Sequence, residues 1–329
     1  MKKIILLLPF FLVLIHCKPS INLDQVLNSK YERHFISSGN NFPQISLDKN
    51  LRYQFLIGLH NGFTKKEISQ KLNWTNNNLI KEIKLLKENG YLKEVNGTLY
   101  PTISIITNKE GIEFYKKTEN IASEIATSIE KIRDTIKQKF LSMEISKKHS
   151  FTEFSFFLYS DVLLDNWQIN NVERDFLKEK RTLRHGKRYY IQYAEKDSTY
   201  TREVFGIYGN QYRCTSGFCY ITYGNNRKNH SKTIEELSEM NIPLLSKSDQ
   251  RVLTDMANFY KPSLIEILEK NRSTFEREYK SSVYRNELTF SEYFIWYYHF
   301  LYTKATNILA QNNSIDIPNT GIFRIKTTK

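Results

Sequence analysis

The apolar positions between residues 51 and 105 repeat first with the period of a helix and then with that of a strand. Leu51 to Leu59 predicts a helix, which ends by Gly62. A second helix begins after Thr64, because Thr64 and Glu67 have the spacing of a capping box. A third helix ends at Gly90. Its apolar stripe is Leu79, Ile83 and Leu86.

Two strands are expected after the third helix. The runs 91–95 and 98–105 flank Asn96-Gly97, a dipeptide that favours a type I′ hairpin turn. The order of helix, helix, turn, helix and hairpin over residues 46–107 resembles winged helix domains of the MarR type. In that family the third helix enters the DNA major groove. The resemblance implies that the outward positions of this helix contact a macromolecule: Asn76, Asn77, Lys81, Lys84 and Lys87.

The chemistry of this face permits nucleic acid but does not favour it. Asparagine can read adenine, and lysine can neutralise phosphate. The third helix has no arginine, however, and Glu82 and Glu88 dilute its positive charge. A protein or another anionic macromolecule is therefore the preferred partner of the winged helix, and nucleic acid is a disfavoured one.

A single long connecting helix is predicted over residues 108–148. Its apolar side chains recur at spacings of four and three, which forms a seam able to face another helix. The seam is Ile125, Ile129, Ile132, Ile136, Phe140 and Met143. We expect it to pack on the second domain of the same chain, and the alternative is a homodimer formed through this helix.

Residues 149–329 predict an α+β domain that we assign to no family. Short alternating runs at 187–193, 204–208 and 218–223 predict an antiparallel meander of three strands. Four helices are expected at about 232–240, 249–260, 262–280 and 290–311, followed by a short strand at 322–325. The whole chain is thus expected to be α+β, with an N-terminal winged helix, a long helix and this C-terminal domain.

The N-terminus has the pattern of an export signal. Lys2 and Lys3 precede the apolar run Ile4 to Ile15, which is too short to span a bilayer, since spanning takes roughly 20 residues. The sequence Leu14-Ile15-His16-Cys17 resembles a lipobox, although His16 stands where that motif has a small residue. The resemblance implies that residues 1–17 form a lipoprotein signal peptide and that Cys17 carries the lipid anchor.

The expected location is therefore extracytoplasmic and membrane-anchored, either periplasmic or at the cell surface. Residues 18–45 are polar and predict a tether between the anchor and the folded body. An ordinary cleaved signal and an uncleaved short anchor are the alternatives, and both still export the body.

Composition and cysteine content narrow the picture further. The 329 residues include 40% hydrophobic side chains, which excludes wholesale disorder, and the net charge of +13 favours anionic partners or surfaces. Three cysteines occur in the chain. In an oxidising compartment we expect Cys214 and Cys219 to form a disulfide, with free thiols as the alternative. A zinc site is not indicated, because no further ligands lie close in sequence.

No catalytic motif, metal site or cofactor site is indicated by the sequence. A basic loop and one stripe of the helix at 290–311 are the candidates for a polar pocket: Arg184, His185, Glu292, Trp296 and His299. Asp161 and Asp165 lie one helical turn apart and are able to bind a cation, but such residues more often cap helices or face solvent.

The leading functional prediction is an exported, membrane-anchored lipoprotein that acts as a non-enzymatic binding or scaffold protein. Its winged helix would contact a macromolecule. The first alternative is a membrane-tethered DNA-binding transcriptional regulator. The second is a hydrolase with its site around His185 and His299, which requires these two side chains to converge.

Overall fold

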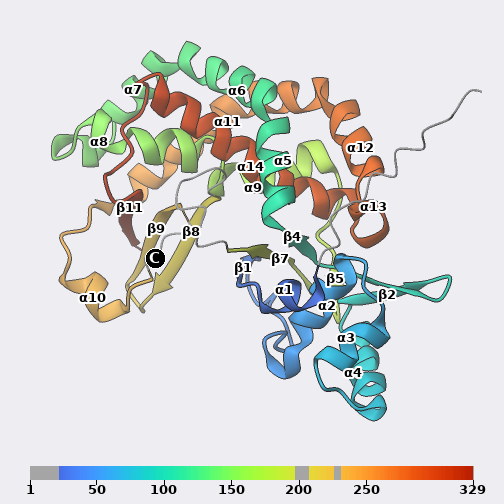
Figure 1. Ribbon diagram of the computed structural model, residues 1–329. Helices are drawn as coiled ribbons and strands as arrows, with labels where there is room; N and C mark the ends of the chain where they lie inside the picture. Colours follow the sequence, from blue (N-terminus) through green and yellow to red (C-terminus); the bar gives the residue numbers. More distant parts are fainter. Residues whose placement is uncertain (1–21, 197–206, 226–230, 329) are drawn as a thin grey trace, which may run out of the picture.

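The computed structural model describes residues 22–196, 207–225 and 231–328, and these residues form an α+β fold (Figure 1). The predicted signal peptide, residues 1–17 with Cys17, lies outside the described residues. The N-terminal part contains α1 (Leu23–Asn28), β1 (Tyr31–Ile36), α2 (Arg52–His60), α3 (Lys65–Lys71), α4 (Asn76–Glu88), β2 (Leu92–Val95), β3 (Thr98–Pro101) and β4 (Ser104–Ile106).

Local signals set the helices and the hairpin of this part. Thr64 and Glu67 form the reciprocal capping box of α3, and the Thr75 hydroxyl accepts from the backbone at the start of α4. Asn96 and Gly97 both have positive φ, at 50° and 78°, as a type I′ turn requires. The apolar faces of these elements meet in one core, which includes Phe55, Leu56, Ile68, Leu86 and Leu99.

The tether predicted over residues 18–45 is contradicted from Leu23 onward, where the chain is folded, and residues 18–21 lie outside the described residues. Leu23 and Val26 of α1 are buried against the N-terminal core, and β1 is part of a sheet. The Asn22 side chain caps α1. The polar residues of the segment led to the tether prediction, but its few apolar residues are enough to dock it.

The predicted long helix is three helices: α5 (Asn108–Lys117), α6 (Glu119–Lys131) and α7 (Arg133–Leu141). At the first break the Thr118 hydroxyl donates to the Tyr115 carbonyl at 2.9 Å, a local bond of the kind that competes with helical bonding. At the second break Ile132 leaves helical geometry, with φ −103° and ψ 7°. The seam packs within the chain, where Ile125, Ile129 and Ile136 are fully buried.

The C-terminal part is mostly helical around two small sheets. Its helices are α8 (Phe151–Phe156), α9 (Asn166–Asn171), α10 (Ile234–Glu239), α11 (Lys247–Lys270), α12 (Arg272–Ser281), α13 (Tyr284–Glu287) and α14 (Phe290–Gln311), with π-helical segments η3 (Phe157–Val162) and η4 (Val172–Leu177). Two 3-10 helices also occur: η2 (Glu144–Lys147) precedes α8, and η1 (Lys49–Leu51) precedes α2 in the N-terminal part. Its strands are β5 (Leu183–Arg184), β6 (Lys187–Arg188), β7 (Tyr190–Glu195), β8 (Tyr208–Cys214), β9 (Phe218–Asn225), β10 (Leu244–Leu245) and β11 (Ile322–Thr328).

The predicted three-strand meander is wrong, because β7 and β8 belong to different sheets. Strand β7 lies between β1 and β4, in the order β1-β7-β4, whereas β8 and β9 form a hairpin in the sheet β10-β11-β9-β8. Strand β7 is antiparallel to β1 and parallel to β4. The predicted runs 187–193 and 218–223 overlap β7 and β9, whereas residues 204–206 of the middle run lie outside the described residues and β8 begins only at Tyr208. A pattern within one segment does not specify partners distant in sequence.

The two halves of the chain are therefore interlocked. Tyr189, Ile191 and Tyr193, from the second half, are buried in the N-terminal core. Figure 1 shows α1 to α4 on one side of the sheet β1-β7-β4, with the larger helical part on the other side and α14 running through it. Helix α14 is buried along most of its length. Within the described ranges, no helix combines the length and apolarity needed to cross a bilayer.

Candidate functional site

A cavity of about 1050 Å³ lies where four elements of different origin meet. Strand β1 comes from the N-terminal part, and α9, β8 and α14 come from the C-terminal part. Small-molecule sites commonly enclose roughly 300–1,000 Å³, so this cavity is of the size that holds a ligand. Asp165, just before α9, Asn210 of β8, and Trp296 and His299 of α14 form a polar part of its lining, which we call the inner end. Asp161 of η3 contacts Asn210 but does not itself line the cavity.

The backbone at the inner end departs from regular helix. Asp161 lies in the π-helical segment η3, where the Leu163 amide donates to the Leu158 carbonyl, five residues back, at 3.0 Å. Asp165 follows with φ −110° and ψ −105°, and α9 begins after it. π-Helical insertions recur at functional sites because they turn side chains out of the regular helical register. Here the insertion directs two carboxyl groups toward the same neighbour.

That neighbour is Asn210 on β8. Its Nδ2 donates to Asp161 Oδ1 at 2.7 Å and lies 3.5 Å from Asp165 Oδ2. Both aspartates are buried, with exposed fractions of 0% and 3%. Burial raises the pKa of Asp161 to about 7, and burial together with the nearby Asp161 carboxylate raises the pKa of Asp165 well above its ordinary value. Among the described residues, no lysine or arginine forms an ion pair with either group.

Three buried polar atoms at or next to this inner end have no hydrogen-bond partner among the residues that the structure describes. They are Asp161 Oδ2, Asn210 Oδ1 and Trp296 Nε1, and Asn210 and Trp296 line the cavity. An unpartnered buried polar group costs about 1–3 kcal/mol, so native structures retain few without a reason. The two oxygen atoms need a hydrogen-bond donor, and the indole N–H needs an acceptor.

His299 completes the inner end as a neutral side chain. Its Nδ1 donates to the Ile295 carbonyl at 2.7 Å, and burial lowers the pKa of the imidazole to about 4. The ring lies between Trp296 and Tyr302, with centroid distances of 5.2 Å and 5.1 Å. With its proton on Nδ1, His299 offers the lone pair of Nε2 as a further acceptor.

The mouth of the cavity is basic. Arg33, Lys196 and Arg181 line it, and each has a carboxylate partner. Arg213 differs, because its guanidinium donates to the Tyr212 carbonyl at 3.1 Å and lies 3.4 Å from the Ser231 hydroxyl. Within the described ranges it has no carboxylate partner. Arg213 is therefore the cation at the mouth that remains available to an anionic group.

Only two of the five residues predicted to form a polar pocket line the cavity. Trp296 and His299 line the cavity, whereas Arg184 and Glu292 form an ion pair elsewhere in the interior, at 2.7 Å. Arg184 also donates to the backbone carbonyls of Tyr189 and Thr102, and Thr182 donates to Glu292 at 2.8 Å. These bonds join β5 to α14 and to the segment between β3 and β4, so this pair holds the two halves together. It is not part of the cavity.

His185 lies apart from His299. It occupies the tight turn between β5 and β6, with a positive φ of 44°, and its Nδ1 is 3.3 Å from the Glu88 carbonyl. His185 is exposed and does not line the cavity that His299 lines. The hydrolase prediction required these two side chains to converge, and the geometry does not bring them together.

Cys214 and Cys219 are joined by a disulfide at the end of the β8–β9 hairpin. They are directly paired across the hairpin, with their Cα atoms 4.1 Å apart. The bond closes the hairpin next to Arg213, at the mouth of the cavity. It therefore restrains the strand that carries both Arg213 and Asn210.

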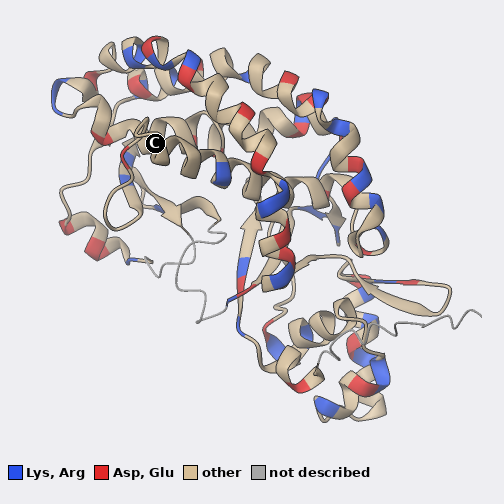
Figure 2. Ribbon diagram, turned by 45° about the horizontal axis from the view of Figure 1, so that its top comes forward, with Lys and Arg blue, Asp and Glu red and all other residues tan. Residues whose placement is uncertain are grey.

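The predicted macromolecule-binding face of α4 is exposed at Asn76, Asn77, Lys81, Lys84 and Lys87. Two of its lysines have acidic neighbours: Lys84 lies 3.9 Å from Glu88, and Lys87 pairs with Glu94 of the hairpin. Figure 2 shows both charge signs on α4. Ile80 was not among the predicted contact positions, but it is 66% exposed in the middle of this face. Glu82 is instead buried and paired with Arg52 at 2.6 Å.

A resident metal is not supported in the part of the chain that the structure describes, where no group of three or more histidine, cysteine, aspartate or glutamate side chains is arranged to hold one. No family model, curated protein or solved structure matches the chain. The case for function therefore depends on the geometry of the cavity.

The role of Asp161 and Asp165 in a buried site was not predicted from the sequence. We expected such residues to cap helices or face solvent, and the structure buries both. A signal was present: Asp161 interrupts a mainly aromatic and aliphatic run from Phe154 to Leu164, and Asp165 directly follows that run. Acidic residues within so apolar a stretch are more readily explained by a buried site than by an exposed face. The contribution of Asn210 depends on tertiary contact, and no local pattern indicates it.

Proposed function

We propose that the protein is an exported, membrane-anchored lipoprotein that binds a small polar ligand in the cavity between β1, α9, β8 and α14. The observation that carries this proposal is the set of buried, unpartnered polar atoms at the inner end, on Asp161, Asn210 and Trp296. A protein interior retains such atoms at a cost. Ligand binding explains why this cavity keeps them.

Binding is a better explanation than catalysis for this arrangement. General acid–base chemistry needs groups placed on either side of a reacting bond. The two aspartates instead lie against one asparagine, and the neutral His299 has its Nδ1 bonded to its own helix. The groups thus form one surface of acceptors with a single indole donor, which is suited to holding a ligand.

We further propose that the N-terminal part is a winged helix held close to the membrane. The order of α2, α3, α4 and the β2–β3 hairpin supports the first point. If Cys17 carries the lipid, residues 18–22 alone separate it from α1, a span of at most about 18 Å. The exposed Ile80 and the paired lysines of α4 favour contact with a protein over reading of DNA.

A single-tryptophan variant tests ligand binding. The chain has three tryptophans, and Trp74→Phe with Trp167→Phe leaves Trp296 as the reporter within the cavity. We expect its fluorescence to change saturably with at least one of three probes: trialanine, maltotriose and citrate. Failure of all three to change the emission contradicts the proposed cavity function. Mass spectrometry of the mature N-terminus tests the anchor separately, because a free terminus beyond Cys17 excludes acylation.

A further inference from the structure

We propose that the ligand is a short peptide with a free N-terminus, whose ammonium group lies against Asp165 and Asn210, next to Asp161, and whose carboxylate points toward Arg213. This inference rests on the proposed ligand-binding function and specifies the chemistry of the same cavity. Three features carry it: the acceptors at the inner end, the cation at the mouth and the volume between them.

Among the described residues, the inner end offers one unpartnered donor, Trp296 Nε1, and no positive charge. Asp161 Oδ2 and Asn210 Oδ1 are buried acceptors without partners, and the Asp165 carboxyl lines the cavity beside them. An ammonium group has three N–H donors and one positive charge, so it can satisfy several acceptors and balance the buried carboxylates. A neutral hydroxyl group would supply one donor and no charge. The ammonium therefore fits this end better than a sugar hydroxyl does.

The opposite charge is found at the mouth. The guanidinium of Arg213 has carbonyl and hydroxyl partners but no carboxylate partner among the described residues. Arginine forms strong bidentate bonds with carboxylates. An anionic group at the mouth and a cationic group at the inner end would together make the ligand a zwitterion.

The space between these ends is too large for a single amino acid. The cavity of about 1050 Å³ also has apolar walls at Phe35 and Ile169, which suit side chains better than charges. Trp296 Nε1 lies unpartnered in the wall and needs an acceptor, which a peptide carbonyl supplies. A short peptide therefore matches the donor, the acceptors and the apolar surface together.

Binding of an ammonium group should also change the protonation of the aspartate pair. Burial favours the protonated form of the aspartate pair, so the free protein retains a proton there near neutral pH. The bound ammonium keeps its own three protons and favours the doubly ionised pair. The proton of the pair is therefore released to solvent, and binding should release up to about one proton per peptide at pH 7.

Isothermal titration of the mature chain tests the inference with matched probes. Trialanine should bind, N-acetyl-trialanine should bind at least about 30-fold more weakly, and trialanine amide should lose about 5- to 10-fold. Comparison of phosphate and Tris buffers gives the number of protons released. Equal affinity for trialanine and its N-acetyl derivative would overturn the inference.

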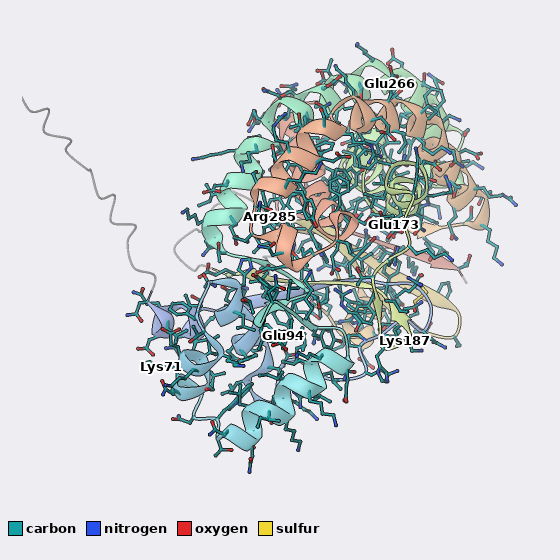
Figure 3. The ribbon with its side chains drawn as sticks, turned by 90° about the vertical axis from the view of Figure 1, so that its right-hand side faces the viewer. Lys71, Glu94, Glu173, Lys187, Glu266 and Arg285 are labelled. Carbon is teal, nitrogen blue, oxygen red and sulfur yellow. A yellow bond between two sulfur atoms is a disulfide. The ribbon has the colours of Figure 1, made fainter. Side chains whose placement is uncertain are left out.

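Variants separate the two ends of the cavity. Asp165→Asn should weaken trialanine at least about 10-fold, and Arg213→Gln should weaken trialanine but not its amide. Asp255→Asn and Arg285→Gln are the controls, since both residues are exposed and neither lines the cavity. Figure 3 shows Arg285 in the helical part of the molecule. Equal effects of Arg213→Gln on trialanine and its amide would overturn the role assigned to Arg213.

The same titrations distinguish failure of the peptide inference from failure of the function. If maltotriose or citrate binds and trialanine does not, the peptide inference is wrong while the ligand-binding cavity stands. If none of the probes binds to a chain with the unfolding transition of the intact protein, both are contradicted. A circular dichroism melt of each variant ensures that lost binding is not lost folding.

Discussion

Two groups of buried carboxylates in this protein differ in how their charge is balanced. At the junction of the two halves, Glu292 pairs with Arg184, and His60 lies 2.8 Å from Glu287 and 3.1 Å from Glu110. At the inner end of the cavity, Asp161 and Asp165 share one neutral asparagine. Both groups are withdrawn from water, but only the first has cationic partners.

The difference separates a structural role from a binding role. Burial of a charge is costly, and a well-placed partner offsets the cost. The junction groups have partners contributed by other elements, so they fix how α2, α5, α13 and α14 meet. The aspartate pair of the cavity has no cationic partner among the described residues when the ligand is absent, so its burial remains destabilising, as is common in preformed binding sites.

The largest effect is expected from breaking the Arg184–Glu292 pair on one side. Arg184→Met leaves the Glu292 carboxylate buried without its partner, so the free energy of unfolding should fall by about 3–5 kcal/mol. Urea unfolding followed by circular dichroism measures it. The double variant Arg184→Met with Glu292→Leu should recover much of the loss. A single variant as stable as the intact protein would show that the pair does not hold the junction.

Replacement of His60 should have the next largest effect and depend on pH. Burial alone would lower the pKa of His60, but Glu287 and Glu110 raise it well above its ordinary value. Its stabilisation is therefore fully present below about pH 6.5 and is lost as the pH rises through the raised pKa. His60→Ala should cost about 2–3 kcal/mol at pH 6 and less at higher pH. A cost that grows with pH would contradict this charge state.

The stabilising contribution of the cavity pair should also fall as the pH rises, but replacement of its carboxylate should stabilise the protein rather than destabilise it. Because the pKa of Asp161 is raised to about 7, the folded state binds a proton that the unfolded state releases above about pH 4. This contribution to stability falls as the pH rises from about 4 through 7. Asp161→Asn should remove that slope and raise the free energy of unfolding at pH 8 by about 1–2 kcal/mol. Urea unfolding at pH 5 and pH 8 measures both quantities, and an unchanged slope would contradict the assignment.

The smallest effect is expected at the exposed face of α4. Ile80 is 66% exposed, so Ile80→Ser should change the free energy of unfolding by no more than about 0.5 kcal/mol. Ile83, on the buried side of the same helix, offers a matched control, and Ile83→Ser should cost several-fold more. Equal costs at the two positions would show that the orientation of α4 is wrong.

The sequence predicted best where the determining contacts are local. The capping box of Thr64 and Glu67 and the Asn96-Gly97 turn depend on residues a few positions apart, and both occur as expected. Helix α14 has the bounds that its apolar periodicity predicted. The breaks at Thr118 and Ile132 were not predicted, because an apolar seam repeats across them without interruption.

Long-range pairing could not be predicted from the same patterns. The alternation of β7 is compatible with β8 as a partner, but β7 pairs with β1 and β4, more than 80 residues away along the chain. The cavity could not be predicted for the same reason, because Asp161, Asn210 and Trp296 come close to one another only when elements distant in sequence pack together. Single residues of the site were therefore recognisable from sequence, but their grouping was not.

The central claim is that the Asp161–Asp165 pair remains uncompensated because it binds a ligand. Asp165→Asn tests this most directly when unfolding by urea and titration with trialanine are carried out on the same preparation at pH 7. We expect the two measurements to change in opposite directions: the free energy of unfolding should rise, and trialanine should bind at least about 10-fold more weakly. A variant that is less stable and binds trialanine as tightly as the intact protein would assign the pair to the structure and contradict the account.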